Sequence, residues 1–454
     1  MFSDWTTSDL SHASLLMSLA LISVILMLSL YSVLLLSRVA RLPWQFGTVI
    51  LAWYVGLAVV FGFFYGDFGN APDGGVYDRQ AMTVAERWGV IGYEIRGREL
   101  AEGKEGFPII MGVVYSLGGH VPFAGVLLNC GVVALTAIVT ACATRSLIGS
   151  VSLRFLTFMF MTWPMFIVMG PALLREALCW LGLALVALGI STWRQSSLKA
   201  SVLLTLGWSL VWWIRTPVAW LIVIGVVTSL SVIFLRRRFG NVGVAVAGLL
   251  ALVALIQFSP TLLEMSGSDS ERLDVVRGAL ARTATSAYSV NAGPLEAVIG
   301  ESGFLLANLP HIAFGPFPWE LGPAVVWLWI LVGSAYWWAT MILIWHSYRS
   351  KPLEDETVVL LVIAATLLVG MGATMTNYGI VVRMRAMPMI ALLVVLAGQP
   401  LIMRLFETNR VPTRQVAHEK GRVTNPHTIS GIPGGIHKGS ASNSFHEPRI
   451  SYPP

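Results

Sequence analysis

The sequence predicts an all-α fold, a polytopic bundle of transmembrane helices, on three observations. Hydrophobic residues make up 56% of the 454 residues and charged residues only 12%, with a mean hydropathy of +0.72. A soluble domain carries about 25% charged residues, so this chain could not cover a water-facing surface. Apolar stretches of about 20 residues recur, which is the length that crosses a bilayer as a helix. These stretches are continuous rather than alternating, which excludes an outer-membrane barrel as well as a soluble enzyme.

We expect about eleven membrane crossings from these stretches. They are placed at residues 14–36, 45–65, 122–143, 152–170, 172–192, 200–214, 216–235, 242–258, 323–346, 357–376 and 386–403. The apolar segment 107–119 is too short to cross easily, so we expect it to be re-entrant or interfacial. The three cysteines fall inside apolar segments and indicate neither a metal motif nor a disulfide framework.

The distribution of Lys and Arg predicts the orientation, because short cytoplasmic loops of membrane proteins carry an excess of both. An N-terminus outside the membrane puts every short basic loop on the inner side: Arg38/Arg41, Arg145/Arg154, Arg194/Lys199, Arg236-Arg237-Arg238 and Arg349/Lys351. The basic C-terminal tail then falls inside as well. We therefore expect a multi-pass protein of an inner or plasma membrane, with its N-terminus outside and its C-terminus in the cytoplasm.

The same orientation leaves two large regions outside, residues 66–106 and 259–322. Both mix aromatic, apolar and charged residues, and long loops in compact proteins are usually functional or disordered. We expect these two to be ordered and functional, with helical fragments around 270–285. Residues 1–403 are thus predicted to form one transmembrane domain that carries both outer loops. Residues 404–454, rich in Ser, Gly, Pro and His, are predicted to be a disordered cytoplasmic tail.

The first outer loop begins with an acidic segment, GDFGNAPDGGVYDRQAMTVAERWG, at residues 66–89. Asp73 and Asp78 lie there at the membrane surface, with a helix expected from about Tyr77 to Trp88. Asp73 before two glycines could simply form a turn, and Asp78 could stabilise the start of the helix. The alternative is a carboxylate held where a membrane-embedded substrate meets water, available as a general base or a metal ligand.

Four arginines lie outside the pattern of basic inner loops. They are Arg175 in GPALLREALCW, Arg215 in WWIRTPVAW, and Arg383 and Arg385 in NYGIVVRMRAMP. All four are predicted on the outer side within apolar sequence, where a positive charge is costly unless it is paired or reaches the interface. They could be interfacial anchors. Four together indicate an anion site, because a guanidinium binds phosphate through two parallel hydrogen bonds. Glu176 could orient one of the arginines or act as an acid.

The second outer loop ends in NLPHIAFGPFPWELGP, residues 308–323. Its four prolines predict a stiff turn rather than a helix, and His311 and Glu320 are its titratable groups. A lone histidine in such a loop is more often structural than catalytic. The sequence contains no GxxxxGK[ST] phosphate loop and no GxSxG, HExxH or CxxC motif, so neither an ATPase motor nor a soluble-type hydrolase is indicated.

Taken in order, these segments resemble two groups of membrane enzymes. The outer loop with DGGVYDRQA resembles integral-membrane glycosyltransferases of the GT-C type, which use polyprenyl-phosphate sugars. The later segments LREALCW, PFPWE and NYGIVVRMR are similar to bacterial polysaccharide polymerases of the Wzy kind. The resemblance spans about residues 60–400, but each motif is short, and the clean paired acids of many GT-C enzymes are not present.

The resemblance implies a division of roles among these residues. Asp73 or Asp78 would activate an acceptor hydroxyl, and the lipid phosphate would be held by four residues, Arg175, Arg215, Arg383 and Arg385. Beside the resemblance, Glu176 is a further catalytic candidate, and Tyr77, His311 and Glu320 are further candidates for binding the substrate. No resident cofactor is required, and a divalent cation with unassigned ligands remains an open alternative. The expected partners are a polyprenyl-linked sugar, a glycan or other acceptor and membrane lipid, with no nucleic acid.

The leading hypothesis is a glycosyltransferase that moves a sugar from a polyprenyl-phosphate carrier to an acceptor at the outer face. Four arginines favour a diphosphate carrier and hence the alternative of a Wzy-like polymerase of oligosaccharide repeats, whereas the first-loop acids favour the transferase. The non-enzymatic alternative is a transporter or a flippase of lipid-linked sugars. Transporters usually carry charges near the bilayer midplane together with repeats, and neither is indicated here. A membrane scaffold would leave the arginines unexplained.

Overall fold

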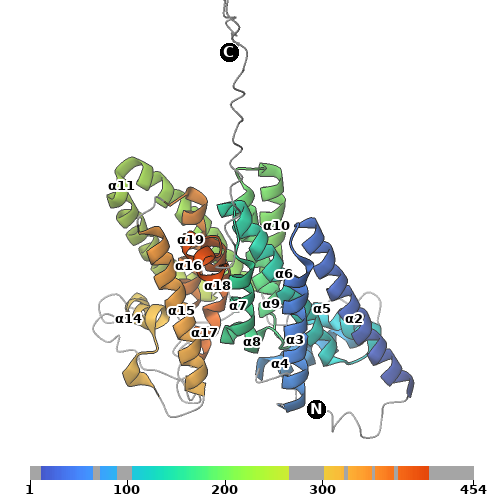
Figure 1. The fold of residues 1–454 in the computed structure, drawn as a ribbon. Coiled ribbons are helices and arrows are strands. Elements are labelled where there is room, and N and C mark those ends of the chain that lie inside the picture. The colour runs from blue at the N-terminus through green and yellow to red at the C-terminus, as the bar shows by residue number, and fades with distance from the viewer. Residues whose placement is uncertain are drawn as a thin grey trace, which may run out of the picture. The chain divides into compact units, whose positions relative to one another are not determined.

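A computed structural model describes residues 12–64, 72–88, 105–264, 301–321, 326–349, 353–372 and 377–407. These residues are helical with short connections, contain no strand, and belong to one compact unit, Met1–Thr408 (Figure 1). The all-α prediction is therefore confirmed for the part of the chain that is described. The fragments expected around 270–285 lie outside the described residues, as does most of the tail expected to be disordered. The prediction is wrong for the start of that tail, because residues 404–406 form the end of a helix, Pro400–Phe406.

The described residues of the first half form these helices in order: α2 (His12–Val39), α3 (Trp44–Phe64), α4 (Pro72–Trp88), α5 (Gly106–Gly118), α6 (Pro122–Ile148), α7 (Leu153–Thr162), α8 (Pro164–Met169), α9 (Glu176–Thr192) and α10 (Ser197–Ile214). The second half continues with α11 (Thr216–Glu264), α14 (Glu301–Phe314), a 3-10 turn (Pro318–Glu320), α15 (Val326–Tyr348), α16 (Asp355–Gly372), α17 (Tyr378–Met384), α18 (Ala386–Leu396) and α19 (Pro400–Phe406).

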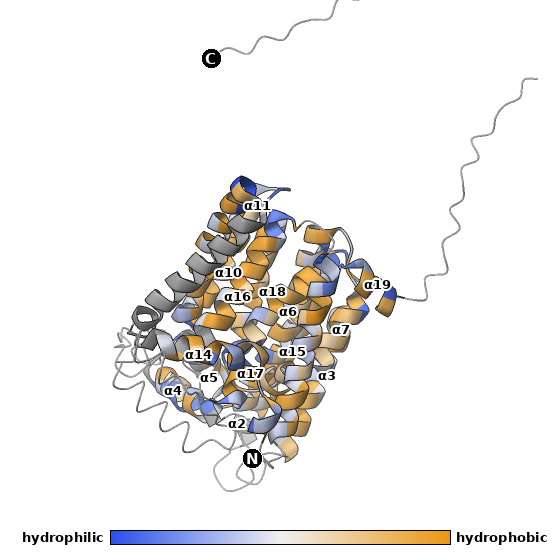
Figure 2. Ribbon diagram, turned by 90° about the vertical axis from the view of Figure 1, so that its left-hand side faces the viewer, coloured by the Kyte–Doolittle hydropathy of each residue, from blue (hydrophilic) through white to orange (hydrophobic). Residues whose placement is uncertain are grey.

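Seven helical segments among the described residues are long and apolar enough to cross a membrane. They are Leu16–Val39, Trp44–Phe64, Pro122–Ile148, Ser197–Ile214, Thr216–Gly240, Trp327–Tyr348 and Tyr378–Leu396. Figure 2 shows the hydrophobic colour along most of these helices. The chain is a multi-pass membrane protein by this composition and length, whereas the count of about eleven crossings and the orientation stay predictions.

Several expected crossings are divided by prolines or by a glycine. The crossing expected at 152–170 is two helices, α7 and α8, which meet at Trp163 before Pro164. Pro400 likewise begins α19 and separates it from α18. A proline lacks the N–H of a helical bond and disfavours α geometry in the residue before it, so the helix ends there. The segment 242–258 continues α11 beyond Gly240, whose φ of 60° interrupts the helix.

The prediction that 308–323 is a stiff turn is wrong for its first part. Helix α14 runs through Pro310, and His311 lies in its last turn. Pro310 lacks the N–H that a residue inside a helix donates, so other contacts have to support the helix here. Trp337 and Trp338 of α15 also donate their indole N–H groups to the carbonyls of Ala313 and Phe314, at 2.9 and 3.0 Å, which pairs carbonyls at the helix terminus.

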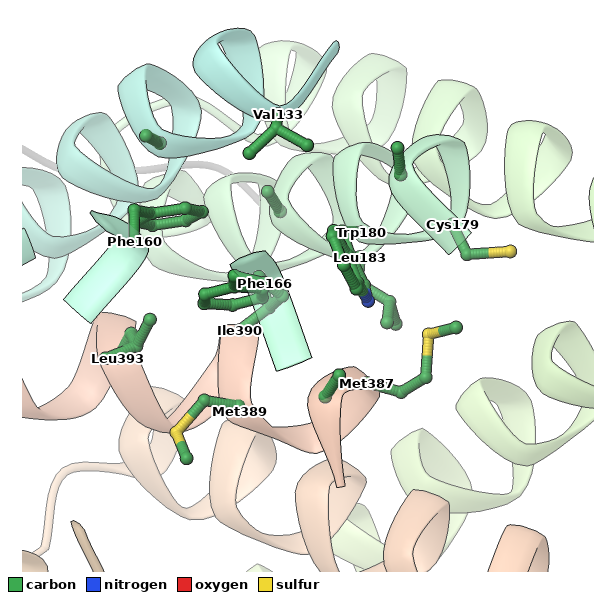
Figure 3. Packing of buried hydrophobic residues seen from close by; sticks show 14 of the residues in the cluster. Val133, Phe160, Phe166, Cys179, Trp180, Leu183, Met387, Met389, Ile390 and Leu393 are labelled. Atoms are coloured by element: carbon green, nitrogen blue, oxygen red, sulfur yellow. The ribbon is translucent and has the colours of Figure 1, made fainter. Parts of the chain in front are cut away.

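The hydrophobic core contains helices from the middle of the chain and helix α18 from its later part. Every residue of α18 is buried, as are most residues of α6. Figure 3 shows Phe166 of α8 and Trp180 of α9 facing Ile390 of α18. The Phe166 ring packs edge-to-face against Trp180 with centroids 4.9 Å apart. Aromatic contacts of this kind stabilise a core beyond the area that they bury. Helix α18 also contacts α9 and α17, the helix directly before it in the chain, so the core brings α9 and α17 together.

Candidate anion-binding site

A buried amide shapes the turn that presents two of the predicted site residues. Asn129 of α6 is fully buried, and its Nδ2 donates to the carbonyls of Ala172 at 2.6 Å and Leu174 at 2.8 Å. The irregular segment between α8 and α9 thus has partners for its backbone, as a buried turn requires. Arg175 and Glu176 follow directly, and Glu176 is the first residue of α9.

Glu176 is the centre of a cluster of charged side chains. It is 1% exposed, and its Oε1 accepts hydrogen bonds from Arg383 Nε at 3.1 Å and from Arg383 Nη2 at 2.5 Å. The Nη1 of Arg215 lies 3.8 Å from the same oxygen. Glu176 therefore lies between two arginines that are distant in the sequence, and its bond to Arg383 spans 207 residues.

Arg383 extends this cluster to the protein surface. Its Nη1 donates to Asp73 Oδ2 at 2.8 Å, and the Asp73 side chain is 53% exposed. The two residues come from α17 and from the first turn of α4, which lie at the same end of the helical unit in Figures 1 and 2. We term this group of five residues the arginine–carboxylate cluster: Asp73, Arg175, Glu176, Arg215 and Arg383.

The cluster has more positive charge than negative and unused hydrogen-bonding capacity. Three guanidinium groups face two carboxylates. Among the described residues, no hydrogen-bond partner is present for the buried Nε and Nη1 of Arg175, for Nη1 of Arg215 or for Oε2 of Glu176. Arg175 is 6% exposed, and its Cζ lies 5.7 Å from the centre of the Tyr77 ring. Buried donors of this kind normally have a partner, so these nitrogens could bind an anion.

Asp78 does not join the cluster. Its buried carboxylate accepts a hydrogen bond from Tyr115 Oη at 2.6 Å, and Nε2 of His120 lies 3.0 Å from both of its oxygens. Burial raises the pKa of Tyr115 well above its usual range, and the bond to Asp78 raises it further. Asp73 and Asp78 lie about 140° apart around α4, because they are five residues apart on a helix. Of the two candidate bases, Asp73 is the one beside the arginines.

Arg385 also lies apart from the cluster. It is fully buried, and it donates to the carbonyls of Ile312 and Gly315, each at 2.8 Å, and to Ser334 Oγ at 2.9 Å. Residues 383 and 385 lie about 160° apart around a helix, so they face different neighbours. Arg385 thus connects the end of α14 to α15, and the structure does not bring it together with Arg175, Arg215 and Arg383.

His311 and Glu320 form a second polar group with Tyr378. Nδ1 of His311 lies 2.8 Å from Tyr378 Oη and 3.0 Å from Glu320 Oε1. Glu320 Oε2 accepts from Tyr378 Oη and from the backbone N–H of Phe317. Tyr378 shares a face of the helix with Arg385, seven residues later. His311 and Glu320 therefore contact the side of α17 that faces away from Arg383.

Four residues that shape these groups were not predicted from the sequence: Tyr115, His120, Asn129 and Tyr378. Asn129 could have been identified, because an amide within an apolar crossing requires internal partners. The other three carry no comparable signal in the sequence. The described residues contain no group of three or more His, Cys, Asp or Glu side chains that could hold a metal ion.

No known protein family, curated protein or solved structure matches the chain.

Proposed function

We propose that the chain is a membrane glycosyltransferase that moves a sugar from a polyprenyl-phosphate carrier to an acceptor at the outer face of the membrane. The observation that carries this proposal is the arginine–carboxylate cluster. Arg175 and Arg215 have buried guanidinium nitrogens without a hydrogen-bond partner among the described residues. A partly buried group of three guanidiniums suits phosphate, because each remains charged and offers a planar pair of donors.

The proposed reaction assigns a role to each member of the cluster. An acceptor hydroxyl attacks the anomeric carbon of the donor sugar, and Asp73 takes the hydroxyl proton as general base. The bond between that carbon and the phosphate oxygen breaks, and its electron pair goes to the phosphate. Arg175, Arg215 and Arg383 stabilise the negative charge that develops there. Glu176 is a positioning residue that holds Arg383 and Arg215 near each other.

The membrane setting supports a lipid-linked donor over a soluble one. The cluster belongs to a multi-pass protein, and Arg383 lies within the apolar segment Tyr378–Leu396. A polyprenyl phosphate already resides in the membrane and presents its charge at the surface, where the half-exposed Asp73 marks the edge of the cluster. No nucleotide-binding motif is needed for such a donor.

A polymerase is the second candidate, and the number of arginines favours it. Three converging guanidiniums are enough for both phosphates of a polyprenyl diphosphate. The product separates these functions: single sugars on an acceptor identify a transferase, whereas a ladder of repeats made from a diphosphate-linked oligosaccharide identifies a polymerase. A flippase would move labelled lipid-linked sugar between leaflets without forming a glycosidic bond.

The experiment is a transfer assay in membranes of cells that express the chain, supplied with radiolabelled polyprenyl-phosphate sugars. We expect labelled glycan with the wild type and less than about one tenth of it with Arg215→Lys, because lysine keeps the charge but lacks the planar pair of donors. Arg79→Lys is the matched control, since Arg79 is exposed on α4 and we expect full activity. Full activity of Arg215→Lys would contradict the proposed site.

A further inference from the structure

We propose that Asp73 and the phosphate of the lipid carrier compete for the same edge of Arg383, so that binding of the donor releases Asp73 to act as a base. This inference rests on the proposed function for the identity of the anion. It concerns the regulation of the same site, and it assigns different functions to the two carboxylates of the cluster.

The donors of Arg383 determine where a phosphate can bind. A guanidinium has two edges that offer a pair of parallel N–H groups to an anion. Glu176 occupies one edge through Nε and Nη2. The other edge lies between Nη1 and Nη2, and Asp73 takes its Nη1 at 2.8 Å. A phosphate that binds this edge through both nitrogens competes with Asp73 for Nη1.

The two carboxylates differ in how readily they can be replaced. Glu176 is 1% exposed, so separating it from Arg383 would leave an unpaired charge in the interior. Asp73 is 53% exposed, and ion pairs at exposed positions contribute little to stability. Asp73 also lies in the first turn of α4, where the positive end of the helix stabilises a carboxylate that has left its arginine. A phosphate is therefore expected to replace Asp73 more easily than Glu176.

The exchange couples the donor to the catalytic base. While Asp73 is bound to Arg383, its Oδ2 accepts the hydrogen bond from Nη1 and is held at the guanidinium. When phosphate takes its place, the carboxylate is released beside the sugar that the phosphate carries. The site also becomes more positive for the phosphate, because once Asp73 has left, the three arginines face only one carboxylate, Glu176. The base is then available only in the presence of the donor.

The test is the affinity of purified protein in nanodiscs for a polyprenyl phosphate, with the uncharged polyprenol of the same length as the reference probe. We expect Asp73→Asn and Asp73→Ala to bind the phosphate about two- to fivefold more tightly than the wild type, because removal of a weak surface ion pair frees Arg383. Both variants should lose transfer. Glu86→Gln is the matched control, since Glu86 is an exposed acid on the same helix, and its affinity should equal that of the wild type.

Unchanged or weaker binding by both Asp73 variants would overturn the exchange, and so would equal tightening by Glu86→Gln, which would indicate a general charge effect. The outcome for the proposed function is separate. If the wild type binds the phosphate and Asp73→Asn binds it more tightly, but no membrane preparation transfers sugar, the proposed function fails and the exchange stands. If sugar is transferred without tighter binding by the Asp73 variants, only the exchange fails.

Discussion

Arg383→Lys is expected to lower the rate of sugar transfer by about 100-fold or more, the range seen when one transition-state donor is removed from an enzyme. Arg383 donates to Glu176 from two nitrogens and to Asp73 from a third. A lysine ammonium is a single point charge on a flexible stem and cannot keep both carboxylates and a phosphate in place. The measurement is the initial rate of transfer in membranes, normalised to the amount of inserted protein.

Arg79→Lys is again the control for this prediction, because it makes the same change at an exposed position of α4. Interfacial anchoring, the alternative explanation for Arg383, predicts the opposite result, since lysine and arginine both extend to the interface. An Arg383→Lys variant with more than about half of the wild-type rate would therefore favour the anchor.

Glu176→Gln is expected to lower the free energy of unfolding by about 3–5 kcal/mol, the cost of removing one partner from a buried ion pair. The substitution keeps the size of the side chain but removes the charge that pairs with Arg383 and lies 3.8 Å from Arg215. The three arginines would then face only the exposed Asp73. Unfolding of the detergent-purified protein is measured as the loss of its monodisperse fraction.

One further variant separates charge from shape at this position, and another is the surface control. Glu176→Asp keeps the charge and should lose less stability than Glu176→Gln. Glu86→Gln removes an exposed acid and should change stability by less than about 0.5 kcal/mol, as surface substitutions usually do. Glu176→Gln with the stability of the wild type would show that the cluster does not depend on its buried carboxylate.

The membership of the cluster could be predicted in large part from the sequence. Arg175, Arg215 and Arg383 are charges within apolar sequence, and such charges require partners. The first-loop acids and Glu176 were the available counter-charges on the same predicted side. The contact between Asp73 and Arg383 spans 310 residues, so it could be anticipated only from this need for pairing and not from any local pattern.

The choice between neighbouring candidates could not be made from the sequence. Asp73 and Asp78, or Arg383 and Arg385, differ in which side of a helix they occupy, and that depends on where each helix begins. Helix α4 begins at Pro72, before the start expected at about Tyr77. Helix α17 is seven residues long and joins α18 at Arg385. Short helices have a weak periodic signal, and packing against their neighbours decides how they are rotated.

Helix boundaries were predicted correctly where length and hydrophobicity decide them, as in α3, but not where a proline interrupts an apolar stretch. Pro164 divides one expected crossing, whereas Pro310 lies inside a helix whose terminal carbonyls bond to Trp337 and Trp338. The helix that contains Pro310 makes tertiary hydrogen bonds between residues 24 positions apart. Local sequence cannot reveal such bonds.

The most direct test of the central claim, that the arginine–carboxylate cluster binds a lipid phosphate, is phosphorus NMR of a polyprenyl phosphate in nanodiscs that contain the protein. The wild type is expected to give a shifted, broadened resonance for the bound phosphate. Arg175→Gln should lose it, because the buried Nε and Nη1 of Arg175 have no hydrogen-bond partner among the described residues and are the predicted phosphate donors. Arg79→Gln should retain it. A bound resonance that is unchanged in a folded Arg175→Gln protein would contradict the claim.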